Sequence, residues 1–298
     1  MRLYDKLNGA DPEVIGVVSA ESDMTGLDIA AIPAVRAFSM SMKTNVEADV
    51  TASLQTAARE AGAKAFLHME AGTGALGSNP DQMGKLIAET AISGGYDGLM
   101  LDIPEVTSRK RADLTKLVKA VNKNLGSMPF YLVVESPTRE GKLYDGYHYE
   151  TLAATVDKLV VKISGIRDVT ESFAVSPIDP LEEMYYALAT LEEEVGEEKL
   201  TLMLESGMDY WLKESRFDLS EKMLEQLLAA ETTEAYYSDR YECAYLIAAD
   251  DLGKPITAWY LTEDGVESRV QLAKSMGISQ ICVSDWDAAT GAFLAGLN

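Results

Sequence analysis

Short runs of aliphatic and β-branched residues recur along this chain, and between them apolar positions return every three or four residues. The runs are typical of buried strands, and the wider spacing is typical of amphipathic helices. Strands are predicted at residues 13–20, 35–42, 63–70, 96–105, 130–135, 156–164, 200–205 and 278–285. Helices are predicted between them, at residues 48–62, 80–92, 109–124, 149–155, 180–194 and 288–297. Strands and helices therefore alternate along most of the chain.

This alternation predicts an α/β protein, and over 298 residues the pattern is that of a (β/α)8 TIM barrel. One stretch departs from it, because residues 219–230 are helical but residues 235–261 contain two β runs around a turn. We therefore predict a single TIM-barrel domain over residues 1–298. It carries a small α+β insertion at residues 212–262, between the seventh and eighth strands.

Acidic residues stand at or just past the ends of several predicted strands. In a parallel barrel the C-terminal strand ends meet at one mouth, where catalytic groups lie. Crowding raises the pKa of at least one carboxyl group, which suits a general acid near neutral pH, and carboxylate pairs operate in most glycoside hydrolases. Each acid could instead be a solvated loop residue or an ion-pair partner of Lys162 or Arg167. These acids are Glu70, Asp102, Glu105, Glu135, Glu205 and Asp285.

Aromatic and histidine side chains add weaker signals. Trp211, Trp259 and Trp286 offer faces that stack on sugar rings, or they are packed core aromatics. His68 lies two residues before Glu70, so on a strand the two share one face. A hydrogen-bonded core histidine is the favoured role for His68.

The charge balance narrows the partners. The chain has 48 Asp and Glu residues against 26 Lys and Arg, a formal net charge of −22. Nucleic acids and anionic membrane surfaces need basic patches, so neither is expected as a partner. The acidity suits an enzyme that acts on neutral or cationic material, or it confers solubility alone. No apolar run approaches the roughly 20 residues of a membrane span, and residues 1–6 lack the apolar core of a signal peptide.

Four segments resemble glycoside hydrolase family 18, most closely its branch of spore-cortex-lytic and spore-germination N-acetylglucosaminidases. Residues 96–102 read Tyr-Asp-Gly-Leu-Met-Leu-Asp, similar to the YDGxxxDxE pattern of that branch. Gly-Met-Asp-Tyr-Trp follows the seventh strand, and Ala-Trp-Tyr closes the insertion. Residues 272–281 resemble the helix-then-strand close of the family. The likeness covers nearly the whole barrel.

The resemblance implies a (β/α)8 barrel that hydrolyses β-linked N-acetylglucosamine glycans without a metal or cofactor. In that family the acetamido oxygen of the substrate attacks the anomeric carbon, and an aspartate stabilises the acetamido group. A glutamate two residues later protonates the leaving oxygen. Asp102 matches the aspartate, and the position of the acid is Pro104. Glu105 is the predicted acid, provided that a bulge or an early strand end turns it toward the mouth. Glu205 or Glu135 could take over part of that role.

The resemblance also implies a glycan-binding groove and a location. The acetamido-binding pair on the sixth strand of the family falls at Ser164 and Gly165. The family works outside the cell, in the cell wall or in the spore, while the sequence leaves a cytoplasmic location open. The residues predicted to bind the glycan are Glu70, Glu135, Glu205, Tyr210, Trp211, Asp285 and Trp286.

Two other functions stay open at this point. One is a barrel without catalytic activity that binds glycans or partners in the same groove. The other is a metal enzyme in which Glu70, Asp102 and Glu135 chelate Mg²⁺ and Lys162 acts as a base. With two histidines, the chain has too few for a histidine-rich zinc site. Its two cysteines, Cys243 and Cys282, lie far apart and form no motif with metal-ligand spacing.

Overall fold

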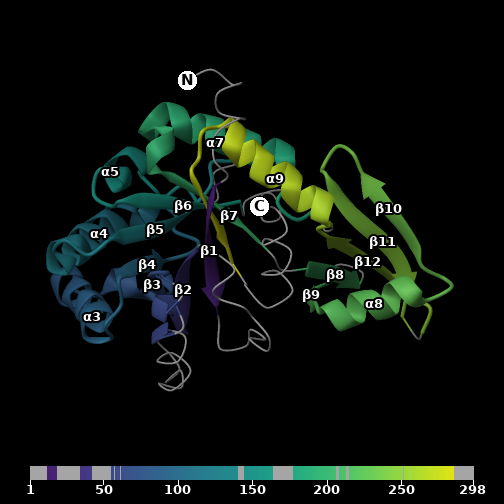
Figure 1. Cartoon of the computed structure of the whole chain (residues 1–298), viewed down its shortest axis with the longest axis horizontal. Coiled ribbons are helices and arrows are strands. Elements are labelled where there is room, and N and C mark those ends of the chain that lie inside the picture. Colours follow the sequence, from purple (N-terminus) through teal and green to yellow (C-terminus); the bar gives the residue numbers. More distant parts are fainter. Residues whose placement is uncertain are drawn as a thin grey trace.

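The computed structural model contains a closed barrel of parallel strands with helices outside it (Figure 1). It describes residues 12–18, 34–41, 55–56, 58–60, 62–139, 144–163, 177–205, 208–212, 215–250 and 252–284. The strand order around the barrel is β1-β13-β7-β6-β5-β4-β3-β2. These strands are β1 (Glu13–Val18), β2 (Ala34–Ser41), β3 (Ala65–Glu70), β4 (Gly98–Asp102), β5 (Phe130–Glu135), β6 (Lys158–Lys162), β7 (Leu200–Leu204) and β13 (Gln280–Val283). The predicted TIM barrel is confirmed.

Helices cover the outside of the barrel. They are α3 (Pro80–Ser93), α4 (Arg111–Leu125), α5 (Tyr149–Ala153), α7 (Leu181–Val195) and α9 (Glu263–Ser275), with short 3-10 helices η2 (Thr73–Gly77), η3 (Ser108–Lys110) and η4 (Glu197–Lys199). Of the predicted helix at residues 48–62, the described residues 55–56 and 58–60 are helical, and the predicted helix at 288–297 lies outside the described residues. Within the described ranges, no helix has the length and apolarity to cross a membrane.

Side chains of the barrel strands alternate between two cores. On β4, Leu99 and Leu101 point outward into the core beneath the helices, whereas Met100 points into the barrel. Asp102 therefore shares the inward face of Met100, since side chains two residues apart on a strand lie on one face. The buried residues of the barrel interior are Ile15, Val17, Phe66, Met100, Val133, Val160, Met203 and Cys282.

Gly98, the first residue of β4, leaves room for an aromatic ring. A Cβ atom at Gly98 would lie 2.3–2.6 Å from three ring carbons of Phe66. That ring is 1% exposed and packs against Tyr131 at a centroid distance of 4.9 Å. We expect Gly98→Ala to lower the free energy of unfolding by about 1–3 kcal/mol in urea titrations, because the core is overpacked. Gly72→Ala is the matched control, since its Cβ meets nothing within 4 Å; equal losses in both variants would contradict the explanation.

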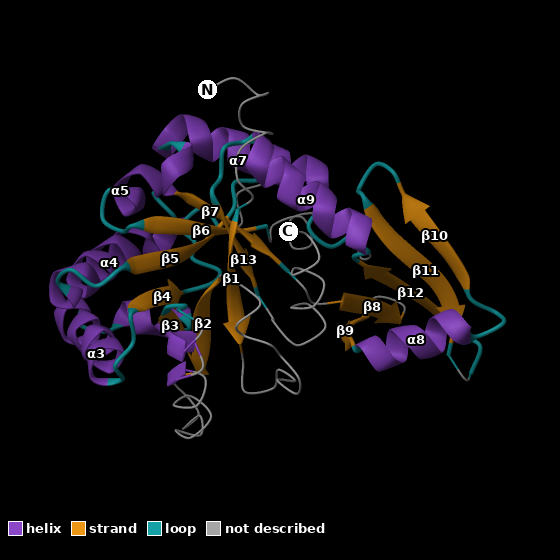
Figure 2. Ribbon diagram, in the orientation of Figure 1, coloured by secondary structure: helices purple, strands orange, loops and turns teal. Residues whose placement is uncertain are grey.

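Between β7 and α9 the chain forms a second, antiparallel sheet beside the barrel, in the order β10-β11-β12-β8-β9 (Figure 2). Its elements are β8 (Met208–Leu212), β9 (Ser215–Leu219), α8 (Glu221–Ala229), β10 (Glu234–Ser238), β11 (Cys243–Ala249) and β12 (Pro255–Tyr260). The sheet begins at residue 208, before the predicted start of the insertion at 212. The sequence pattern indicated only β11 and β12, because β8, β9 and β10 are short and mix polar with apolar residues.

Helix α8 covers one face of this sheet. Ser220 is its N-cap, and the hydroxyl of Ser220 accepts the N–H of Met223 at 3.3 Å. Its apolar residues Met223, Leu224 and Leu227 pack against buried sheet residues. Those buried residues are Leu219, Leu246, Ala248, Ile256 and Ala258.

A fully buried arginine on α9 joins the insertion to the barrel. The guanidinium of Arg269 is 0% exposed and donates only to backbone carbonyl oxygens in the bonds that the structure shows. The donor–acceptor distances are 2.7–3.1 Å, and the bonds join the start of α7, the turn between β10 and β11, and α9 itself. The acceptors are the carbonyls of Ile178, Asp179, Tyr241, Glu242 and Gly265.

Candidate active site

Acidic side chains and one lysine meet at the C-terminal ends of the barrel strands, which form the mouth of the barrel. Asp102 ends β4 and Glu135 ends β5, and the two residues are 8% and 4% exposed. In the strand register Asp102 is paired with Glu70 on β3, and Glu135 is paired with Lys162 on β6. Neighbours in a parallel register face the same side of the sheet, so all four side chains belong to the inward face.

The carboxyl group of Asp102 is held close to neutrality by burial. Burial raises its pKa to about 6, the positive charge of Lys162 opposes the rise, and the charge of Glu70 adds to it. Asp102 is therefore ionised in most molecules at pH 7 and protonated in most molecules at pH 5.

Glu135 carries the larger shift. Burial raises its pKa to about 7, with contributions from the charges of Asp102 and Glu205, while Lys162 and a hydrogen bond from the backbone N–H of Glu105 oppose the rise. Its Oε2 atom is buried and has no hydrogen-bond partner among the described residues. At neutral pH a large fraction of Glu135 is protonated, so this carboxyl group can donate a proton.

Lys162 pairs with the next acid around the mouth. Its Nζ lies 3.6 Å from Oε1 of Glu205. Burial lowers the pKa of Lys162, but the charges of Glu205, Asp102 and Glu135 outweigh burial and raise it. The lysine therefore stays protonated and partly neutralises the carboxylates around it.

Glu105 lies outside this buried cluster. Strand β4 ends at Asp102, and Glu105 follows Pro104 with a left-handed φ of 59° and an exposed side chain. What Glu105 contributes to the cluster is its backbone N–H, which donates to the carboxylate of Glu135. The geometry therefore favours Glu135 over Glu105 as the acid.

Of the aromatic residues considered from the sequence as contacts for a sugar, Tyr210, Trp211 and Trp259 lie in the insertion sheet. Tyr210 stacks on Phe217 at a centroid distance of 5.2 Å and packs into the cluster beneath α8. Trp211 is 4% exposed, which leaves little ring face for a sugar. Trp259 packs against Tyr245 at 4.7 Å. The remaining predicted positions Asp285, Trp286, Ser164, Gly165 and Arg167 lie outside the described residues.

Sequence reasoning missed three residues that support the site. The phenol of Tyr147 donates to the carbonyl of Ile103, and that of Tyr149 donates to the carbonyl of Glu135, both at 2.8 Å. Asp179, 2% exposed, accepts the backbone N–H of Glu205 at 2.8 Å. The tyrosines of residues 144–149 stand out in the sequence, but no spacing rule gives the carbonyl groups to which they donate. No local pattern singles out Asp179.

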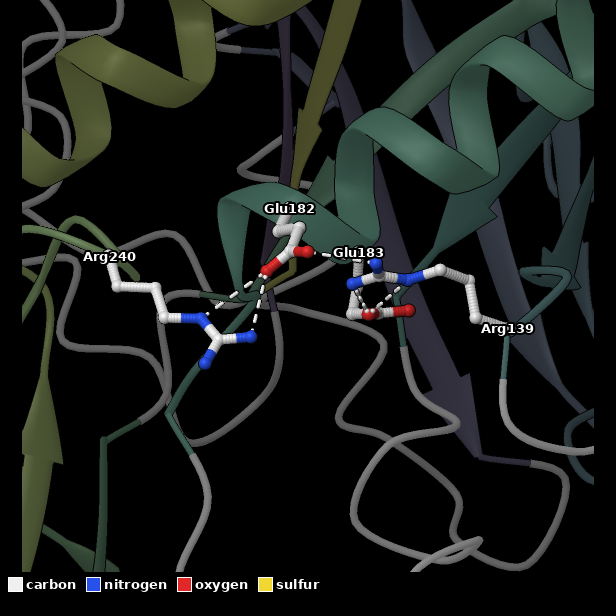
Figure 3. A network of polar contacts seen from close by, with 4 residues as sticks. All are labelled: Arg139, Glu182, Glu183 and Arg240. Atoms are coloured by element: carbon white, nitrogen blue, oxygen red, sulfur yellow. Dashed lines mark hydrogen bonds and ion pairs between the residues drawn. The ribbon is translucent and has the colours of Figure 1, made fainter.

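A chain of ion pairs at the start of α7 connects two further segments (Figure 3). Arg139, four residues after Glu135, donates from Nε to Glu183 at 2.9 Å and from Nη1 to Glu182 at 2.8 Å. Glu182 also accepts from Nη2 of Arg240, in the turn of the insertion, at 3.2 Å. The two pairs made by Glu182 are exposed and contribute about 0–1 kcal/mol each, so they orient these segments more than they stabilise them.

The described acids of the mouth do not form a metal site. Among the residues that the structure describes, no three His, Cys, Asp or Glu side chains lie close enough together to hold a metal ion. Glu70, Asp102 and Glu135 are all described, so the Mg²⁺ ligand set considered from the sequence is wrong. The ammonium group of Lys162 interacts with Asp102 and Glu135 instead.

Neither a family model nor a curated protein sequence matches the chain. Solved structures do match it. The spore cortex-lytic enzyme SleL from Bacillus cereus aligns with a TM-score of 0.77 at 14% identity, over 96% of this chain and 75% of that chain. A class V chitinase from Pseudomonas fluorescens Pf-5 aligns with a TM-score of 0.76 at 14% identity, over 96% and 100% of the two chains.

A glycoside hydrolase family 18 N-acetylglucosaminidase from Paenibacillus barengoltzii aligns with a TM-score of 0.69 at 11% identity, over 96% of this chain and 98% of that chain. At such identities the likeness is one of fold. The chain thus has the TIM-barrel fold of chitinases, spore cortex-lytic enzymes and N-acetylglucosaminidases, and the resemblance predicted from the sequence is confirmed at that level.

Proposed function

We propose that this protein is a glycoside hydrolase that cleaves β-linked N-acetylglucosamine glycans, with Glu135 as its general acid. The observation that carries the proposal is a carboxyl group 4% exposed, with a pKa of about 7, at the mouth of a barrel. A general acid works best when its pKa lies near the working pH. The proposed substrate class, peptidoglycan, chitin-type chains or N-glycans, is supported by a shared fold with chitinases, spore cortex-lytic enzymes and an N-acetylglucosaminidase.

In the proposed reaction the acetamido oxygen of the sugar attacks the anomeric carbon as the glycosidic bond breaks. Glu135 gives its proton to the leaving oxygen, and Asp102, ionised above about pH 6, orients and stabilises the acetamido group. Attack by the acetamido oxygen leaves a cyclic intermediate, in which this oxygen is bonded to the anomeric carbon. Water then attacks the anomeric carbon, the bond to the acetamido oxygen breaks, and the water gives a proton to Glu135. Lys162 holds Glu205 beside this centre through their ion pair.

We also propose a location for the protein, at the cell wall or in the spore. Spore cortex-lytic enzymes are among the proteins that share the fold, so the substrate proposed first is a cell-wall or spore glycan. The formal net charge of −22 suits an uncharged glycan better than an anionic one.

The rate should show two limbs in its dependence on pH. Asp102 must be ionised, so kcat/KM falls as the pH drops below about 6, and Glu135 must be protonated, so kcat/KM falls as the pH rises above about 7. Initial rates on tetra-N-acetylchitotetraose from about pH 4 to pH 9 measure both limbs. A rate that stays constant above pH 8 would contradict the role of Glu135 as acid.

One observation favours a second candidate, a glycan-binding barrel without catalytic activity. Proline occupies the position at which the resemblance places the acid, and Glu105 is exposed. Mass spectrometry of products separates the two candidates. The protein is incubated with peptidoglycan fragments, chitooligosaccharides and N-glycans, and new reducing ends support hydrolysis. Binding of a sugar without cleavage of any of the three supports the second candidate.

A further inference from the structure

His68 is a buried histidine that the proposed reaction does not use. It lies on β3 two residues before Glu70, so it points into the barrel one layer below the mouth, and it is 7% exposed. Neither Nδ1 nor Nε2 has a hydrogen-bond partner among the described residues. The sequence favoured a hydrogen-bonded core histidine, but the described residues provide no hydrogen bond to the ring of His68.

The surroundings of His68 differ above and below the ring. On its own strand the inward neighbour below is Phe66, and its register partner on β4 is Met100, both in the apolar interior. Above it lie the side chains of the mouth, where Oε2 of Glu135 is also buried and has no partner within the described part of the chain. A buried polar atom without a partner is unfavourable, so a group entering from the mouth gains by pairing with such atoms.

The ring is uncharged under ordinary conditions. Burial, and next the positive charge of Lys162, lower the pKa of His68 to about 4. A neutral imidazole presents one N–H donor and one nitrogen acceptor, and it has no charge with which to attract an anion. It therefore suits a hydroxyl or an amide, groups that both donate and accept.

We propose that His68 is a specificity-determining residue of the site, whose imidazole hydrogen-bonds an uncharged hydroxyl or amide of the bound glycan. The inference rests on the proposed function, because it takes the ligand to be a glycan bound at the mouth. When the glycan binds, at least one of the two ring nitrogens of His68 gains a hydrogen bond.

Nuclear magnetic resonance of histidine nitrogens tests the proposal directly. The chain has two histidines, and the other, His148, is exposed and caps α5 by accepting the N–H of Thr151, so it is an internal control. With ¹⁵N-labelled histidine, titration of tetra-N-acetylchitotetraose should shift the His68 nitrogens and leave those of His148 in place. A bound sugar that leaves both histidines unshifted overturns the proposal and leaves the proposed function intact.

Two variants separate recognition from folding. We expect His68→Leu to weaken binding of tetra-N-acetylchitotetraose about ten- to hundredfold and to raise the thermal midpoint, because an unpaired polar ring leaves the barrel. His68→Gln keeps a donor and an acceptor and should recover most of the affinity. Equal affinity in the wild type and His68→Leu overturns the proposal. If none of peptidoglycan fragments, chitooligosaccharides and N-glycans binds the wild type, the proposed function itself fails.

Discussion

Replacing Glu135 by glutamine should lower kcat by roughly 10²–10⁴-fold, because the variant keeps the shape of the side chain but has no proton to donate. Glu135 is the strand-end acid that combines 4% exposure with a pKa of about 7. KM should change little, since the amide still fits where the carboxyl group stood. Product formation from chitooligosaccharides, followed by mass spectrometry, gives both constants.

The matched control is Glu105→Gln. The exposed carboxylate of Glu105 lies outside the cluster, and its backbone N–H, which donates to Glu135, survives the substitution. We expect this variant to keep its rate within a few-fold of the wild type. The opposite pattern, a rate lost in Glu105→Gln and kept in Glu135→Gln, would restore the acid predicted from the sequence.

Arg269→Ala should destabilise the fold more than any other substitution considered for this chain. The guanidinium satisfies carbonyls at the start of α7, in the turn between β10 and β11, and on α9, and it does so without exposure to solvent. Its removal leaves several buried carbonyls unpaired, at about 1–3 kcal/mol each before relaxation. We expect a total loss of about 3–5 kcal/mol, measured as a shift of the urea midpoint.

Arg240→Ala is the control for this substitution. Arg240 reaches the same region of α7 through Glu182, but its side chain is 69% exposed, so its loss should cost less than about 1 kcal/mol. The account would be contradicted if the two variants unfolded at the same urea concentration. Because Asp179 also accepts the N–H of Glu205, the Arg269 variant should in addition lose activity at urea concentrations below its unfolding transition.

The barrel could be read from the sequence because each strand carries a strong local signal. Runs such as residues 130–135 and 200–205 are apolar on both faces, and only strands covered on both sides need that composition. The inward direction of Asp102 also follows from strand parity with Met100. Only two of the five strands of the insertion sheet, β11 and β12, could be predicted. The other strands are short and contain polar residues, and the pairing of such strands depends on tertiary neighbours.

The choice of acid could not be read from the sequence in the same way. A motif places residues along the chain, and it does not say how deeply a side chain is buried. Glu105 and Glu135 are equally acidic residues past or at a strand end, yet one is exposed in a left-handed turn and the other is enclosed. The burial that raises the pKa of Glu135 comes from tertiary neighbours such as Tyr149, and the charge of Lys162, which opposes the rise, comes from another strand.

The central claim is that Glu135 holds a proton near neutral pH, and a direct titration tests it without knowledge of the substrate. Carbon NMR of side-chain carboxyl groups labelled in glutamate gives the pKa of each, and the signal absent from Glu135→Gln assigns the residue. We predict a titration midpoint near pH 7 for that signal. A midpoint near the ordinary glutamate value of 4.5 would contradict the account, because the carboxyl group would then have lost its proton long before neutral pH.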